Sequence, residues 1–154
     1  MKKLMALLAL AVGGAAFAHK SVAPQKITTF LMFEGKAEEA IQFYVSLFKD
    51  AKVVDLQRYG KEGPGAEGSV KVATFTLNGQ EFMAIDSPAK HAFTFTASIS
   101  LYVKCATAQE VEDLFKKLSE GGQVFMPLGK YPFSDKFAWI ADKYGVSWQL
   151  ALTK

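Results

Sequence analysis

The architecture is indicated by residues 37–53, AEEAIQFYVSLFKDAKV, because residues 108–124, AQEVEDLFKKLSEGGQV, repeat the same pattern. A fixed internal period indicates a duplicated structural unit, and it takes precedence over any single predicted element. In both copies apolar residues recur at helical spacing, which predicts an amphipathic helix leading into a strand. The residues that match at one constant offset are Glu39-Ala40 with Glu110-Val111, Phe43-Tyr44 with Leu114-Phe115, Leu47 with Leu118, and Val53 with Val124.

Runs rich in β-branched and aromatic residues flank both helices in the same order and predict strands. Asn78-Gly79 between two of these runs is the strongest short hairpin signal that a sequence carries. The sequence therefore predicts one α+β domain, residues 26–153, made of two tandem βαβββ modules (27–86 and 97–152) that form a curved mixed sheet around a concave cavity. The expected strands are 27–33, 52–59, 70–77, 80–86, 98–104, 123–128, 137–142 and 146–152, and the expected helices are 36–49 and 107–120.

Local signals mark the ends of these elements. Thr107 with Glu110 three residues later predicts the start of the second helix, and Gly121-Gly122 predicts its end. Residues 60–68 and 129–136 contain glycine and proline within polar stretches, which indicates loops.

Alternation along the strands predicts which side chains line the cavity, because neighbours on a strand point to opposite faces. The side chains assigned to the helix-covered face are Phe30, Met32, Ile99, Leu101, Val103, Trp148 and Leu150. Phe33 and Ser147 are assigned to the cavity, and Trp139 either walls it or packs in the core. The candidate ligand-binding residues are Thr29, Leu31, Met83, Ser98, Ser100, Tyr102, Trp139 and Gln149.

Such a cavity is partly polar and rimmed by aromatic rings, which suits a small organic ligand. The alternative is that the hydroxyl groups only bond to the backbone inside a filled barrel.

Residues 1–18 have the pattern of a cleaved secretory signal peptide. Lys2 and Lys3 precede an apolar stretch, and Ala16-Phe17-Ala18 provides small residues for cleavage after Ala18. The apolar stretch is shorter than the ~20 residues of a membrane span, which favours a leader over a retained anchor. We therefore expect a periplasmic or secreted protein with a short linker at 19–25 and no membrane attachment after cleavage.

The leader also accounts for most of the positive charge. Without Lys2 and Lys3, 16 basic residues face 15 acidic ones. A nearly neutral chain has no electrostatic footprint for nucleic acid.

Cys105 is the only cysteine, so an internal disulfide is excluded. A nucleophilic thiol needs an activating neighbour, and none is evident, so we expect a small buried or surface residue.

Three motifs resemble the PhnB-like proteins of the vicinal oxygen chelate group, the fold group of glyoxalase I and the bleomycin resistance proteins. They are FLMFEGKAEEAIQFY at residues 30–44, LNGQEFMAID at 77–86 and DKYGVSWQL at 142–150. These proteins are often labelled 3-demethylubiquinone methyltransferase-like, a label that their fold does not justify. The resemblance covers nearly all of residues 27–152, and it implies the paired βαβββ fold and a homodimer.

The wider fold group includes metal-dependent enzymes, and in one of them, glyoxalase I, four side chains on the first, fourth, fifth and eighth strands hold the ion. Carried over by position, these ligands fall on Thr29, Met83, Ser98 and Gln149. Only Gln149 is an ordinary ligand type, since hydroxyls and a thioether suit zinc, nickel or magnesium poorly. We therefore expect no metal and no other cofactor, with a divalent ion such as Zn, Ni or Mg as the alternative.

Three side chains are weak catalytic candidates: Asp86, His91 and Gln149. Asp86 could act as a base at a strand end, or it could be a solvated carboxylate. His91 could exchange protons near neutral pH, or it could be an ordinary loop histidine.

Three functions remain open at this stage. The first is a binding or sequestering protein that holds a small amphipathic molecule in a dimeric cup. The second is a glyoxalase- or isomerase-like lyase that uses a divalent metal. The third is an interaction module that pairs through the Phe-rich segment 93–96.

Overall fold

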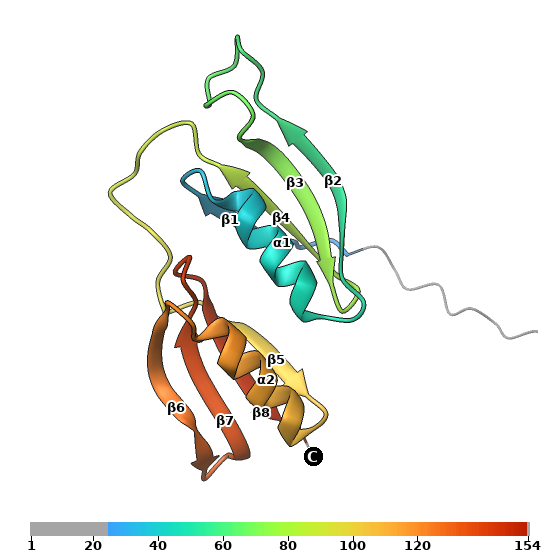
Figure 1. Ribbon diagram of the computed structural model, residues 1–154, viewed down its shortest axis with the longest axis vertical. Helices are drawn as coiled ribbons and strands as arrows, with labels where there is room; N and C mark the ends of the chain where they lie inside the picture. The colour runs from blue at the N-terminus through green and yellow to red at the C-terminus, as the bar shows by residue number, and fades with distance from the viewer. Residues whose placement is uncertain (1–24, 154) are drawn as a thin grey trace, which may run out of the picture.

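The computed structural model describes residues 25–153, and these fold into the two predicted βαβββ modules (Figure 1). The α+β fold expected from the internal repeat is confirmed. The predicted signal peptide and most of the predicted linker lie outside the described residues. Module one contains β1 (Thr29–Phe33), α1 (Ala37–Leu47), β2 (Lys52–Arg58), β3 (Val70–Leu77) and β4 (Gln80–Asp86). Module two contains β5 (Leu101–Cys105), α2 (Ala108–Leu118), β6 (Gln123–Tyr131), β7 (Ser134–Ala141) and β8 (Ser147–Leu152).

Each module has its own four-stranded sheet, in the orders β1-β4-β3-β2 and β5-β8-β7-β6. The first strand of each module pairs parallel with the last, and the other pairs are antiparallel. Figure 1 shows both helices on the same side of the molecule, each in front of its own sheet. The opposite face of each sheet carries no helix and is called the open face below.

The core lies between each helix and its sheet, because the apolar stripe of each helix faces inward. Asn78 and Gly79 both have positive φ, as a two-residue hairpin turn of the predicted kind requires. Among the described residues, no helix is long and apolar enough to cross a membrane. The buried helix residues are Ala37, Ala40, Ile41 and Tyr44 in α1, and Val111, Leu114 and Leu118 in α2.

The helices begin in different ways. Thr107 caps α2, since its Oγ1 accepts a hydrogen bond from the backbone N–H of Glu110 at 3.1 Å, while the Glu110 carboxylate accepts from Ala106 N–H at 2.8 Å. Thr107 is the predicted cap, whereas Glu110 accepts from the residue before the cap rather than from Thr107 itself as in a standard capping box. Lys36 precedes α1 and provides no side-chain cap. The start of α1 therefore depends on a residue elsewhere in the chain.

The predicted facing of the first strand is wrong. Leu31 and Phe33 are buried under α1, whereas Phe30 is 55% exposed. In the parallel register Thr29 lies beside buried Phe82, and Phe30 lies beside Met83. The open face of module one therefore carries Phe30, Met32 and Met83, because side chains that are partners in register point to the same face. Every residue from 30 to 33 is large and apolar, so alternation could not distinguish the two faces.

The start of β5 and the loop at 129–136 also differ from the prediction. Ser98 lies in a turn before β5, and Ile99 is 77% exposed rather than packed under a helix. The strands β6 and β7 continue through most of the expected loop and leave only Pro132 and Phe133 between them. Several register shifts between β6 and β7 accommodate the glycine and proline residues of this hairpin.

The two modules are joined at the buried carboxylate of Asp142, directly after β7. Its Oδ1 accepts backbone N–H bonds from Tyr144 at 2.9 Å and Val146 at 3.0 Å, which close the turn before β8. Its Oδ2 accepts from Trp148 Nε1 at 2.8 Å and from the hydroxyl of Tyr44 in α1 at 2.7 Å. A buried carboxylate is tolerated only when donors satisfy its oxygens. One side chain therefore shapes the turn and ties it to the other module.

Burial shifts the pKa values of two ionisable groups at this joint, Asp142 and Tyr44. Burial raises the pKa of Asp142, while the hydrogen bonds from Trp148 and Tyr44 oppose that rise. Burial and the neighbouring Asp142 carboxylate also raise the pKa of Tyr44. The phenol therefore keeps its proton and remains a donor to the carboxylate.

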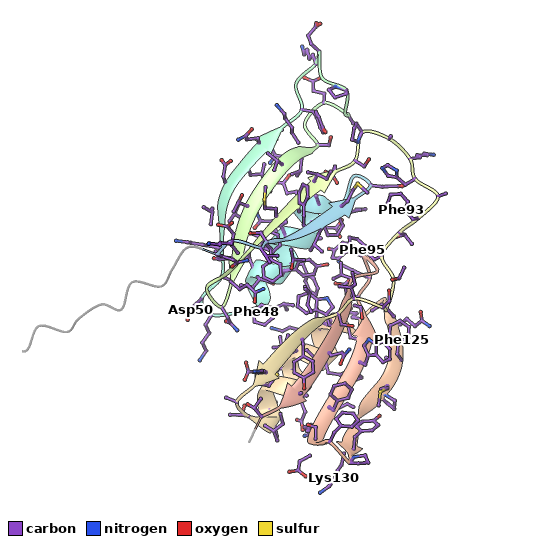
Figure 2. All side chains as sticks on the ribbon, turned by 180° about the vertical axis from the view of Figure 1, so that it is seen from behind. Phe48, Asp50, Phe93, Phe95, Phe125 and Lys130 are labelled. Atoms are coloured by element: carbon purple, nitrogen blue, oxygen red, sulfur yellow. The ribbon has the colours of Figure 1, made fainter. Side chains whose placement is uncertain are left out.

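Aromatic rings and a surface ion cluster surround the joint. The ring centroids of Tyr44 and Trp148 are 5.2 Å apart. Phe95 comes from the segment that links the modules, and its ring lies 5.1 Å from that of Phe33 where the modules meet (Figure 2). At the surface, hydrogen bonds from Lys36, Tyr144 and Lys143 hold the pKa of Glu39 at about 2.

We expect Asp142→Asn to lower the free energy of unfolding by roughly 2–4 kcal/mol, because an amide has one oxygen and leaves two buried donors without an acceptor. Tyr44→Phe removes a single donor and should cost about 1–2 kcal/mol. Urea denaturation followed by intrinsic fluorescence measures both values. Asp113→Asn on the exposed surface of α2 serves as the matched control. Equal midpoints for Asp142→Asn and Asp113→Asn would contradict the role of this joint.

Candidate functional site

The strongest candidate site is on the open face of module two, where β5, β8 and β7 lie side by side. Tyr102, Gln149 and Trp139 occupy neighbouring positions across these three strands. Tyr102 is 55% exposed, and the other two are half-buried. Leu150 and Trp148, on either side of Gln149, are buried on the opposite face, as predicted. Strand alternation therefore aims this row of three side chains away from the helix.

Hydrogen bonds connect the row into one polar cluster. The indole Nε1 of Trp139 donates to Ser147 Oγ at 2.9 Å. Ser147 Oγ and Ser100 Oγ are 2.7 Å apart, and Gln149 Nε2 donates to Ser100 Oγ at 3.2 Å. Three predicted ligand-binding residues, Ser100, Trp139 and Gln149, are thus brought together, with Tyr102 beside Gln149. The hydroxyl groups bond to other side chains and not to the backbone, unlike the alternative of a filled barrel.

Aromatic rings extend the cluster along β6 and β7. The Phe125 ring lies 5.1 Å from Trp139, and Figure 2 shows Phe125 on module two. Further along β7, Phe137 is buried beneath Tyr131 and Phe133, whose ring centroids lie 5.8 and 5.0 Å from it. The face thus combines a small neutral polar cluster with apolar rings, a composition typical of sites for small organic molecules.

Sequence reasoning missed Phe125. The register shift between Val124 and Met126 breaks the alternation of β6. Two-residue alternation therefore could not predict the sheet face on which Phe125 lies. Ser147 was correctly placed on the open face, but its role as the bridge between Trp139 and Ser100 depends on pairing across strands.

The remaining predicted ligand-binding residues do not join this cluster. Ser98 is exposed and its Oγ lies 2.5 Å from Thr96 Oγ1. Thr29 and Leu31 line a cavity of about 260 Å³ between the modules, which Leu101 and Ser147 also line. Met83 lies on the open face of module one. Thr29, Met83, Ser98 and Gln149 therefore do not converge as the four positions of one site.

Asp86 is a structural residue rather than a solvated strand end. It is 4% exposed, and its Oδ1 accepts the backbone N–H of Ala37 at 2.9 Å. Its Oδ2 accepts the backbone N–H of Val70 at 3.0 Å. A carboxylate at a helix N-terminus satisfies free N–H groups and complements the helix dipole. Asp86 thus supplies the cap that α1 lacks locally, and both of its oxygens are occupied.

His91 lines an open groove of about 590 Å³ at the junction of the modules. Its Nε2 lies 2.7 Å from Ser87 Oγ, and its ring stacks on Phe93 with centroids 4.7 Å apart. Lys36 and Lys143, which also line the groove, are paired with Glu39. His91 therefore lies away from Gln149 in the fold, and the geometry does not combine the two into one catalytic group.

The side chains on the open faces do not suit a glyoxalase-type metal ion. Among residues 25–153, no three His, Cys, Asp or Glu side chains are close enough to hold an ion. In glyoxalase I the metal ligands lie on the first, fourth, fifth and eighth strands. On the corresponding strands of this chain, Phe30 pairs in register with Met83, and Tyr102 pairs with Gln149. A divalent ion requires several hard oxygen or nitrogen donors, and here Gln149 provides the single ordinary one.

The comparisons with known proteins agree with the observed fold. A family model described as 3-demethylubiquinone-9 3-methyltransferase matches residues 25–151. The chain belongs to this PhnB-like family. It is 63% identical to a PhnB protein from Bacillus cereus, with a TM-score of 0.83, over 84% of this chain and all of that one. No curated protein matches the chain.

More distant solved structures share the fold of this PhnB-like chain. Protein PA1353 from Pseudomonas aeruginosa is 26% identical, with a TM-score of 0.73, over 84% of this chain and 98% of that one. The fosfomycin resistance protein FosX from Listeria monocytogenes, in complex with Mn(II), is 12% identical with a TM-score of 0.55, over 86% of this chain and 95% of that one. These likenesses place the two modules in the vicinal oxygen chelate fold.

Cys105 is buried at the end of β5. The sequence left a buried and a surface position as alternatives, and the buried one is observed. Burial, with a smaller contribution from Glu110, raises the pKa of its thiol to about 12. The thiolate is the reactive form, so the folded protein should not react with a disulfide reagent at pH 8. We expect slow labelling by 5,5′-dithiobis(2-nitrobenzoate) in buffer and rapid labelling in 8 M urea. Rapid labelling of the folded chain would contradict this assignment.

Proposed function

We propose that this PhnB-like chain is an exported protein that binds a small organic molecule on the open face of module two, without a glyoxalase-type metal. One observation carries the proposal. Trp139, Ser147, Ser100 and Gln149 form a connected polar cluster on an open sheet face, next to the rings of Phe125 and Tyr102. Polar groups fixed beside aromatic surface provide orientation and apolar contact for a ligand.

The proposal includes a second copy of the chain as the cover of the site. An open sheet face alone cannot enclose a ligand, whereas small-molecule sites usually bury most of their ligand. Large apolar side chains exposed on the single chain support association, because such surface is commonly covered by a partner. They include Phe30, Phe93, Ile99, Tyr102 and Phe133.

Native mass spectrometry of protein purified from its own compartment tests the binding proposal. We expect a noncovalent organic adduct on a dimer, and we expect Trp139→Ala to lose the adduct while remaining folded. Trp139 is half-buried, and Tyr59→Ala, a half-buried aromatic residue directly after β2 in module one, is the matched control. Retention of the adduct by Trp139→Ala would place the ligand elsewhere. A stoichiometric, tightly held divalent ion after dialysis would contradict the metal-free part of the proposal.

Export has a separate test. The proposed leader ends at Ala18, so the N-terminal residue of the mature protein should be His19. Edman sequencing of protein from the periplasm or the medium reads this residue directly. A chain that keeps Lys2 and Lys3 and remains in the cytoplasm would show that residues 1–18 are not a cleaved signal.

A further inference from the structure

The hydrogen-bond cluster on the open face of module two restricts the chemistry of its ligand, because each hydroxyl has a single proton to donate. Trp139 Nε1–H can only donate, so Ser147 Oγ accepts this bond. Gln149 Nε2 likewise donates to Ser100 Oγ. The bond between Ser147 and Ser100 is the one whose direction the distances leave open.

Burial decides that direction. Ser147 is 2% exposed, and among the described residues its Oγ has Trp139 and Ser100 as hydrogen-bond partners. If Ser100 donated, the proton of Ser147 would be buried without an acceptor, which costs about 1–3 kcal/mol. Ser147 therefore donates to Ser100. The proton of Ser100 is then left over, on a side chain that is only half-buried.

Gln149 presents the complementary acceptor. Its Nε2 is engaged with Ser100, whereas within residues 25–153 no hydrogen bond is made to its Oε1. A primary amide carries two N–H donors and one carbonyl oxygen. Gln149 therefore offers an acceptor and a remaining N–H side by side on the open face, next to the free proton of Ser100.

The cluster contains no ionisable side chain. Trp139, Ser147, Ser100 and Gln149 are neutral, and the nearest cation along the same strand face is Lys104, two residues beyond Tyr102. A carboxylate ligand would place its negative charge against the free oxygen of Gln149. A group with both a donor and an acceptor satisfies the amide edge without burying a charge.

We infer that the site takes a neutral planar ring whose edge carries a carbonyl oxygen and an adjacent N–H, as in a cyclic amide. This edge pairs with Gln149 and Ser100, while the ring packs against Trp139 and Tyr102. The indole plane is held in place by its bond to Ser147, so Ser147 acts as a positioning residue. The inference rests on the proposed function, since it names the ligand class of the same site.

The test uses 2-pyridone and N-methyl-2-pyridone, which differ in whether the ring N–H is present. Binding to the dimeric full-length mature chain is followed by NMR, through the indole N–H signal of Trp139, which Trp139→Phe identifies. We expect 2-pyridone to bind at least tenfold more tightly, because the methyl group removes the donor that Gln149 Oε1 accepts. In Gln149→Leu we expect this preference to fall to about threefold or less.

The outcomes separate the inference from the proposed function. If both probes shift the Trp139 signal with equal affinity, the ligand class is wrong and binding at this face stands. If the preference survives in Gln149→Leu, the amide edge is not the recognition element and the inference fails. If neither probe shifts the Trp139 signal, the inference fails, and only the test for a native adduct bears on the proposed function. An unchanged urea midpoint for Gln149→Leu shows that the variant is folded.

Discussion

The fold depends on burying the carboxylate of Asp142 with all of its donors in place. This group lies where a helix of one module meets a turn of the other, so no single module can satisfy it alone. Tyr44 reaches it across the boundary, and Trp148 reaches it from the following strand. Separation of the modules would break the bond from Tyr44 to Asp142 together with the ring contact between Tyr44 and Trp148. The relative position of the modules is therefore fixed more by this polar contact than by strand pairing, since the two sheets remain separate.

The family motifs acquire a physical meaning from the same arrangement. Asp142, Trp148 and the turn between them belong to the closing motif, and Tyr44 ends the opening one. Asp86 ends the middle motif and caps the helix inside the opening one. The three motifs thus hold one another through two buried carboxylates. Within the closing motif, Gln149 presents an amide oxygen to which no described residue bonds on the open face of module two.

Much of the fold could be predicted from the sequence, because its signals are local. The three- to four-residue spacing of apolar residues in each helix, the Asn78-Gly79 turn and the Thr107–Glu110 cap each depend on residues that are close together in the sequence. The facing of β1 could not be predicted, since large apolar residues occupy both of its sides. Of the candidate site, the facing of Ser100, Tyr102 and Gln149 followed from simple alternation, whereas for Trp139 the sequence left the cavity wall and the core as alternatives. Phe125 and the bridging role of Ser147 did not follow from alternation, because bulges and cross-strand bonds are set by the three-dimensional pairing.

The two ways of starting a helix have a consequence for the order of folding. α2 carries its cap within its own sequence, so its first turn can form while the rest of the chain is still unfolded. The cap of α1 is completed only when Asp86, 49 residues later at the end of β4, is in place. Although the ribosome makes α1 first, its nucleus is completed by long-range closure, with the loop entropy that such closure entails. The helix that is synthesised first, α1, thus depends on a distant residue for its cap, whereas the helix that is synthesised later, α2, has a local one.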